Sequence, residues 1–119
     1  MDFDGTVCTH EYPAIGKDAG AIPVLLKLQK AGAKICLNTL RTGAALDEAV
    51  QWLDERGVRL HGINRNPDAE QWARDNGKPF STKVHADCYI DDKGFGVPLK
   101  QMGDFVVVDW EAIDRSFLL

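Results

Sequence analysis

Two aspartates separated by one residue stand at the beginning of the chain, in the stretch Asp2-Phe3-Asp4-Gly5-Thr6. In an extended chain, residues two apart project to the same side, so Asp2 and Asp4 are expected to approach one small site. Two negative charges at such a short distance repel each other unless a cation or a shared proton offsets them. The spacing therefore indicates a metal-binding or acid–base pair, although Asp-x-Asp also occurs in nucleotide-sugar transferases and in plain turns.

Three further groups of polar residues lie beside apolar stretches that we expect to be buried strands. Thr39 and Arg41 follow Ile35-Cys36-Leu37, Lys83 lies shortly before another apolar stretch, and Asp91-Asp92 ends that stretch. Ligand sites in open α/β sheets collect at the carboxyl ends of strands. Carboxylates, a hydroxyl and an ammonium at such ends are the groups that metal-assisted phosphoryl transfer requires.

The order of these groups resembles the four motifs of the haloacid-dehalogenase (HAD) superfamily. Those motifs are Asp-x-Asp-Gly-Thr, a Thr after an apolar strand, a Lys, and an apolar strand that ends in Asp-Asp. The resemblance spans about residues 2–92, and the segment 83–93 is especially similar to small phage- and bacterial-type HAD hydrolases. It implies a Mg²⁺-dependent phosphatase, a hydrolase that acts on a phosphomonoester.

The resemblance implies a role for each matching carboxylate. Asp2 is expected to be the nucleophile that forms an aspartyl-phosphate, and Asp4 the general acid and then the general base. The side chains of Asp2 and Asp91 and the backbone carbonyl of Asp4 are expected to bind Mg²⁺. Asp92 would bind the metal directly or through a metal-bound water. The alternative for Asp91-Asp92 is a simple turn.

The other matching residues are expected to act on the phosphate group. Thr39 would donate to the phosphoryl oxygens, Lys83 would neutralise charge on Asp2 and on the transferring group, and Arg41 is placed to contact the substrate. Each has an alternative without catalysis, because Thr39 could cap the turn after its strand and a lysine is usually just solvated. Thr6 is expected to make local hydrogen bonds rather than to bind substrate.

Residues 10–13 (His-Glu-Tyr-Pro) follow the first motif, where HAD proteins place a mobile flap. His10 or Tyr12 could therefore gate the substrate, whereas a zinc role for His10 lacks a second ligand at suitable spacing. The connections 4–39 and 39–83 leave no room for a cap domain. We therefore expect a capless core whose open site faces a phosphorylated small molecule or a larger phosphorylated substrate, or is covered by a second subunit of a homo-oligomer.

Short apolar runs alternate with amphipathic ones, and this pattern predicts a Rossmann-like, three-layer α/β/α fold with a mainly parallel sheet. Only Met1 precedes Asp2, although such a domain should begin with an apolar strand, so we expect that strand to be truncated or to lie upstream of Met1. The expected helices are 18–31 (capped by Asp18), 44–56 (capped by Thr42) and 68–76, and the expected strands are 33–38, 58–60, 88–90 and 105–108.

Length, composition and charge exclude some classes of protein. A chain of 119 residues has room for one domain, residues 1–119, and its 45% apolar content is ordinary for a globular protein. Its longest apolar runs are too short for a membrane span, and a net charge of −4 without a basic run gives no clear nucleic-acid surface. Three cysteines without metal-ligand spacing suggest buried, reduced thiols in a cytoplasmic protein.

Two other classes of protein share part of this pattern. Receiver domains also gather acidic residues, a hydroxyl and a lysine around Mg²⁺, but their acidic pair comes first and their acceptor Asp lies in mid-chain. A catalytically silent HAD-like protein would keep the fold as a scaffold for Mg²⁺ or phosphate binding. The order of the motifs favours the phosphatase over both.

Overall fold

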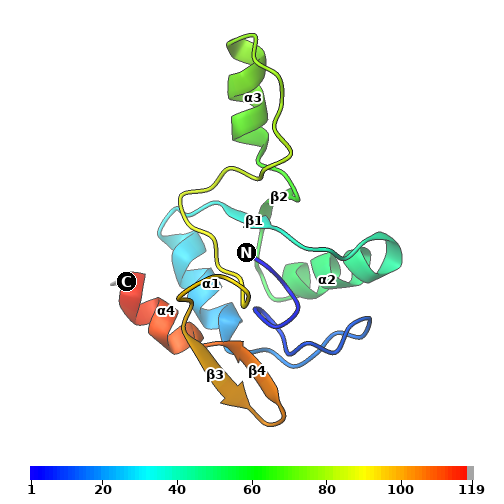
Figure 1. Ribbon diagram of the computed structural model, residues 1–119, viewed down its shortest axis with the longest axis vertical. Coiled ribbons are helices and arrows are strands. Elements are labelled where there is room, and N and C mark those ends of the chain that lie inside the picture. Colours follow the sequence, from blue (N-terminus) through cyan, green and yellow to red (C-terminus); the bar gives the residue numbers. More distant parts are fainter. Residues whose placement is uncertain (118–119) are drawn as a thin grey trace.

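The computed structural model describes residues 1–117 and combines helices with short strands (Figure 1). In chain order the elements are α1 (Ala21–Lys30), β1 (Ile35–Leu37), α2 (Gly43–Glu55), β2 (Leu60–Ile63), α3 (Pro67–Asp75), β3 (Leu99–Met102), β4 (Phe105–Val108) and α4 (Trp110–Phe117). β1 and β2 pair in parallel, and β3 and β4 form an antiparallel pair. The mixed α/β class expected from the sequence is therefore confirmed.

Polar side chains and glycines fix where the helices begin and end. Asp18 Oδ1 accepts the backbone N–H groups of Gly20 and Ala21, each at 2.9 Å, so α1 begins three residues later than the expected helix. Asn66 Oδ1 accepts the N–H of Asp68 at 3.0 Å, which starts α3 close to its expected position. Thr42 precedes α2 but its side chain makes no capping hydrogen bond, contrary to expectation.

Two expected strands are corrected by the backbone hydrogen bonds. The strand expected at 58–60 instead covers Leu60–Ile63, because the Val58 N–H donates to the Leu53 carbonyl at 3.0 Å and completes the end of α2. Residues 88–90 form no strand at all. One backbone hydrogen bond, from Asp2 N to the Ile90 carbonyl at 2.9 Å, joins them to a neighbouring segment, and one bond does not make a ladder.

A mainly parallel sheet was also expected, and the second strand pair departs from it. The strand at 105–108 is confirmed, but it pairs antiparallel with β3, a strand that the sequence pattern did not indicate. Gly103, with φ of 61°, supplies the backbone conformation of the two-residue connection between them. A connection that short can join only antiparallel neighbours, and β4 pairs with β3 rather than with β1 or β2.

The hydrophobic core lies between the N-terminal segment, α1, β1, α2, β4 and α4. Figure 1 shows α1 and α4 side by side, and Lys27 Nζ on α1 contacts Asp114 Oδ1 on α4 at 2.7 Å. In the same view α3 projects away from this body. The largest fully buried side chains in the core are Phe3, Leu25, Leu37, Leu53 and Trp110.

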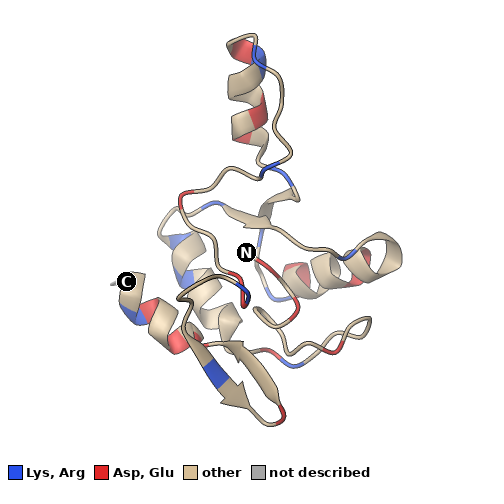
Figure 2. Ribbon diagram, viewed as in Figure 1, with Lys and Arg blue, Asp and Glu red and all other residues tan. Residues whose placement is uncertain are grey.

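The surface agrees in part with the sequence-based expectations. No helix within residues 1–117 is long and apolar enough to cross a membrane. Basic positions are dispersed over α1, β3 and α4 rather than gathered in one stretch (Figure 2). All three cysteines are free thiols, but only Cys8 is buried; Cys36 is half-buried and Cys88 is exposed.

The buried hydrogen bond from Trp110 Nε1 to the Thr6 carbonyl, 2.7 Å long, generates a stability prediction. Trp110→Phe keeps an aromatic ring but leaves that buried carbonyl without its donor, which typically costs about 1–3 kcal/mol. Urea unfolding followed by circular dichroism should show this loss. Trp72→Phe is the matched control, because Trp72 is 60% exposed and its change should stay within about 0.5 kcal/mol. Equal effects of the two substitutions would contradict the prediction.

Candidate functional site

The first two residues lie between β1 and the segment that ends in Asp91-Asp92. The Met1 amino group donates to the Cys36 carbonyl at 2.7 Å, and the Met1 carbonyl accepts the Asn38 N–H at 2.7 Å. On the other side, Asp2 N donates to the Ile90 carbonyl at 2.9 Å. These hydrogen bonds place Asp2 next to the end of β1 and beside residues 91 and 92.

Three carboxylates meet at this point. Each of Asp2, Asp91 and Asp92 offers an oxygen such that the three atoms lie within 4.8 Å of one another, and each residue is half-buried. Oxygen atoms from carboxylates are the ligands that Mg²⁺ and Ca²⁺ prefer. The structure therefore brings together three of the expected metal-binding residues.

Thr6 links two of these acids through its hydroxyl group, which is fully buried. Its Oγ1 lies 3.2 Å from Asp2 Oδ2 and 3.4 Å from Asp92 Oδ1, and it accepts the Asp92 N–H at 2.9 Å. The hydroxyl has one proton and can donate to only one carboxylate at a time. The expectation of local hydrogen bonding by Thr6 is confirmed, but its bridging of the two acids was not foreseen.

Gly5 allows the two segments to approach this closely. A Cβ at this position would lie 2.4 Å from Asp92 Oδ2, and the φ of Gly5 is 81°. Both conditions exclude a side chain without a shift of the backbone or of Asp92. The absence of a side chain at Gly5 therefore allows both the turn and the close contact with Asp92.

Crowding of the carboxylates changes the ionisation of Asp2. Burial raises the pKa of Asp2 to about 7, helped by the hydrogen bond with Asp92 and by the charges of Asp91 and Asp92, while the Phe3 backbone N–H opposes the rise. Asp2 in the metal-free protein can thus hold a proton near neutral pH. A cation bound among the three acids would offset the same repulsion.

The Asp4 carboxylate does not join the cluster but pairs with Arg41. Arg41 Nε and Nη2 donate to the two Asp4 carboxylate oxygens, each at 2.8 Å, and the Arg41 side chain is 1% exposed. The expectation that Asp2 and Asp4 project into one site assumed an extended chain. The Thr6 and Val7 N–H groups instead donate to the Phe3 carbonyl, so the chain already turns at Phe3.

Arg41 is also not free for a substrate, which corrects its expected role. Nη1 donates to the carbonyls of Pro13 and Ala45 at 3.1 Å each, and Nη2 donates to the Ala14 carbonyl at 2.8 Å. Together with the two bonds to Asp4, all five N–H groups of the guanidinium are used. A phosphate contact would have to replace one of them.

Thr39 lies just beyond the end of β1, as expected, and is half-buried. Its backbone N–H donates to Asn64 Oδ1 at 2.8 Å, and its Oγ1 accepts the Arg41 N–H at 3.1 Å. The bond to Arg41 matches the turn-capping alternative. It leaves the hydroxyl proton available, so donation to a phosphoryl group stays a prediction.

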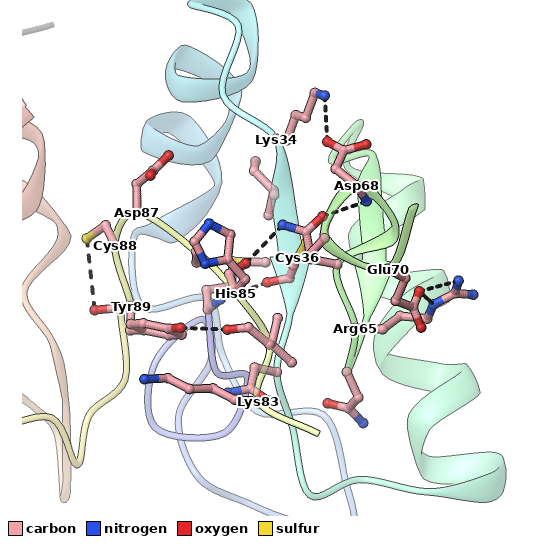
Figure 3. A pocket seen from close by; sticks show the side chains of 18 of the residues that line it. Lys34, Cys36, Arg65, Asp68, Glu70, Lys83, His85, Asp87, Cys88 and Tyr89 are labelled. Atoms are coloured by element: carbon pink, nitrogen blue, oxygen red, sulfur yellow. Dashed lines mark hydrogen bonds and ion pairs between the residues drawn. The ribbon is translucent and has the colours of Figure 1, made fainter. Parts of the chain in front are cut away.

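Lys83 is not brought to the carboxylates. It makes no ion pair with Asp2, Asp91 or Asp92 in the part of the chain that the structure describes, and its Nζ lies 5.8 Å from the centre of the Tyr89 ring. It lines a cavity of about 1110 Å³ (Figure 3), which the three clustered acids do not line. Its role in neutralising charge on Asp2 stays a prediction.

The raised pKa of Asp2 predicts how stability depends on pH without metal. The unfolded carboxyl titrates near 3.8 and the folded one at about 7, so the folded state binds the proton more tightly. The resulting stabilisation is complete below about pH 4 and is lost as the pH rises through 7. Asp2→Asn should remove this loss and be more stable than the wild type at pH 8 by on the order of 1 kcal/mol, allowing for solvent screening.

Urea unfolding in chelator at pH 5 and pH 8 measures this difference. The matched control is Asp104→Asn in the exposed β3–β4 turn, which should follow the wild type at both pH values. An Asp2→Asn variant with the same pH dependence as the wild type would contradict the assignment of the raised pKa.

Comparisons with known proteins found a related solved structure. No protein-family model matches the chain, and no curated protein matches it. A solved structure described as that of "the conserved protein coded by locus from Bacteroides thetaiotaomicron" is similar with a TM-score of 0.76 and 33% sequence identity. The alignment covers 98% of this chain and 85% of that one. The chain belongs to the same family as this conserved Bacteroides thetaiotaomicron protein.

Proposed function

We propose that this protein is a Mg²⁺-dependent phosphohydrolase of the HAD type, which cleaves a phosphomonoester through an aspartyl-phosphate on Asp2. The observation that carries the proposal is the convergence of Asp2 with Asp91 and Asp92, whose oxygens lie within 4.8 Å of one another although the residues are about 90 positions apart. The substrate would be a phosphorylated small molecule or a larger phosphorylated partner.

The backbone pairing supports a Rossmann-like order around the site. Met1-Asp2 lies beside β1 on one side and beside Ile90 on the other, and β2 pairs in parallel with β1. In such an arrangement the candidate residues follow the carboxyl ends of adjacent segments, where α/β enzymes bind ligands. The finer proposal is a capless three-layer α/β/α core built on this order.

The residues at the site fit a hard divalent cation. The Asp2 and Asp91 carboxylates would hold Mg²⁺, with Asp92 as a direct or water-mediated ligand. The Asp4 carbonyl would be a further ligand, and it accepts no hydrogen bond within residues 1–117. Bound there, Mg²⁺ would offset the carboxylate charge and the charge of the phosphoryl group.

The proposed reaction assigns one task to each carboxylate of the Asp-x-Asp pair. An oxygen of ionised Asp2 attacks phosphorus, and the bond from phosphorus to the leaving oxygen breaks as that oxygen takes a proton from Asp4. Asp4 then removes a proton from the water that hydrolyses the aspartyl-phosphate. To act as the acid, Asp4 must carry a proton on an oxygen that now accepts from Arg41, so one of those hydrogen bonds must be given up.

A catalytically silent, receiver-like or HAD-like protein that binds Mg²⁺ and phosphate is the second candidate. Two observations favour it: Lys83 makes no ion pair with the acidic cluster among the described residues, and the Arg41 guanidinium is fully engaged by protein groups. Such a protein would bind Mg²⁺ but would not turn over any phosphate ester.

Single-turnover kinetics with acid-quench trapping of phosphoprotein test the two carboxylates. Asp2→Asn should abolish turnover and phosphoprotein almost completely, because an amide is a poor nucleophile. Asp4→Asn should slow the reaction by about 10² to 10⁴, most for esters with poor leaving groups. Phosphoprotein that accumulates in Asp2→Asn but not in Asp4→Asn would reverse the assignment, and a wild type without any turnover would favour the silent protein.

Metal dependence gives a separate test. Asp91→Ala should weaken Mg²⁺ binding by at least about tenfold, because even outer-shell partners of metal ligands contribute about 10- to 100-fold to affinity. Isothermal titration calorimetry with Mg²⁺ measures this loss, and Asp104→Ala, in the exposed turn, should bind like the wild type. Full turnover in excess chelator would count against the whole proposal.

A further inference from the structure

The Arg41 side chain joins three segments of the chain. It reaches Asp4 in the N-terminal turn, the carbonyls of Pro13 and Ala14 in the loop 10–16, and the Ala45 carbonyl in α2. Its five N–H groups are all used, and it is 1% exposed. A buried guanidinium with every donor satisfied holds its partners in a fixed geometry.

Arg41 helps to hold the loop 10–16 on the rest of the protein, together with the hydrogen bond from Thr9 Oγ1 to Glu11 Oε2 at 2.7 Å and the packing of Ile15 against the hydrophobic core. At its base, Thr9 N donates to the Lys17 carbonyl and Lys17 N donates to Thr9 Oγ1, each at 2.8 Å. Beyond this base, every hydrogen bond that joins residues 12–14 to the rest of residues 1–117 comes from Arg41. The Tyr12 ring adds a cation–π contact, with its centre 5.2 Å from Arg41 Cζ, while Tyr12 stays 53% exposed.

The orientation of the Asp4 carboxylate also depends on the Arg41 guanidinium. Both Asp4 carboxylate oxygens accept from Arg41, and the Asp4 side chain is 11% exposed. The Phe3 ring, next to Asp4 in the chain, also lies against the guanidinium, 5.1 Å from Cζ. A displacement of the loop therefore removes part of what fixes Arg41, and through it the orientation of the Asp4 carboxylate.

We propose that Arg41 is a positioning residue that couples the loop 10–16 to the Asp4 carboxylate, and not a residue that binds the phosphate. This inference rests on the proposed function for its kinetic consequences, but not for its structural ones. The coupling is reciprocal, so a change at either end of Arg41 alters the other end.

Hydrogen exchange followed by mass spectrometry tests the coupling without any substrate. Arg41→Lys keeps the charge but provides only three donors on one atom, so it cannot hold Asp4 and three carbonyls together. Exchange of the Thr9 and Lys17 amides, whose hydrogen bonds close the base of the loop, should rise by at least about tenfold while α1 and α4 stay protected. Arg59→Lys, at an exposed position, is the matched control and should exchange like the wild type.

A second variant covers the case in which Arg41→Lys does not fold. Tyr12→Ala weakens the loop end of the contact without touching Asp4, and Tyr12 is exposed enough for the fold to tolerate the change. Its control is Phe80→Ala, because Phe80 is 55% exposed and has Arg74 Cζ 5.6 Å from its ring centre. Unchanged exchange of the Thr9 and Lys17 amides in Tyr12→Ala would overturn the coupling.

Kinetics distinguish a positioning role from contact with the substrate. In single turnovers with an alkyl phosphate, whose leaving group is poor, Arg41→Lys should slow phosphoprotein formation by about 10- to 100-fold, and with 4-nitrophenyl phosphate by much less, whereas hydrolysis of the phosphoprotein should slow equally for both esters. Tyr12→Ala should show the same pattern more weakly. Inhibition by inorganic phosphate should be unchanged in both variants, since the proposal gives Arg41 no phosphate contact.

Different results would contradict the positioning role of Arg41 and the proposed function. A weaker affinity for inorganic phosphate with an equal slowing of phosphoprotein formation from both esters would show that Arg41 acts on the substrate, and would overturn the positioning role. A wild type without phosphatase activity would end the proposed function alone. The exchange experiment would still decide whether Arg41 couples the loop to Asp4.

Discussion

The architecture of the site depends on how three carboxylates are held within 4.8 Å of one another. None of them is fully exposed, so water offsets only part of their repulsion. The chain holds them by a buried hydroxyl, Thr6 Oγ1, and by a glycine, Gly5, that leaves room for Asp92. Trp110 in turn fixes the Thr6 carbonyl from α4. The raised pKa of Asp2 follows mainly from the burial of its carboxyl group, to which the hydrogen bond with Asp92 and the charges of Asp91 and Asp92 add.

Asp2 and Asp4 are two residues apart, yet they occupy different environments. Asp2 faces two other carboxylates, whereas Asp4 faces the buried guanidinium of Arg41. Acid–base chemistry with two carboxylates requires such a difference, because groups in equal environments cannot take separate roles. The turn at Phe3 creates it, by ending the extended geometry that would have sent both side chains to one side.

Local signals predicted the helices and the acidic cluster better than the sheet. Glycines and capping side chains act over a few residues, so α3 lies within one residue of the expected helix. The approach of Asp2 to Asp91 was expected from the order of the motifs, although residues 88–90 form no strand and contact Asp2 through one backbone hydrogen bond at Ile90. Strand pairing depends on distant partners, and the irregular course of residues 88–90 has no local signature; the β3–β4 hairpin has one, the Gly103-Asp104 turn, but the weakly apolar β3 hid it. The hydrogen bonds of Arg41 to Asp4, Pro13 and Ala14 were not foreseen, because these partners lie far from Arg41 in the sequence.

The Arg41 contacts also bear on how a small core could shield its chemistry. Aspartyl-phosphate chemistry requires control over water, which must be excluded from the first step and admitted to the second. In a HAD-type core without a cap domain, this task falls to loops beside the site. The loop 10–16 is tied through Arg41 to Asp4, the group that would activate the water. In the proposed reaction, a displaced loop would disturb Asp4 at the same time as it admits solvent, and Arg41 would link water activation to the position of the loop.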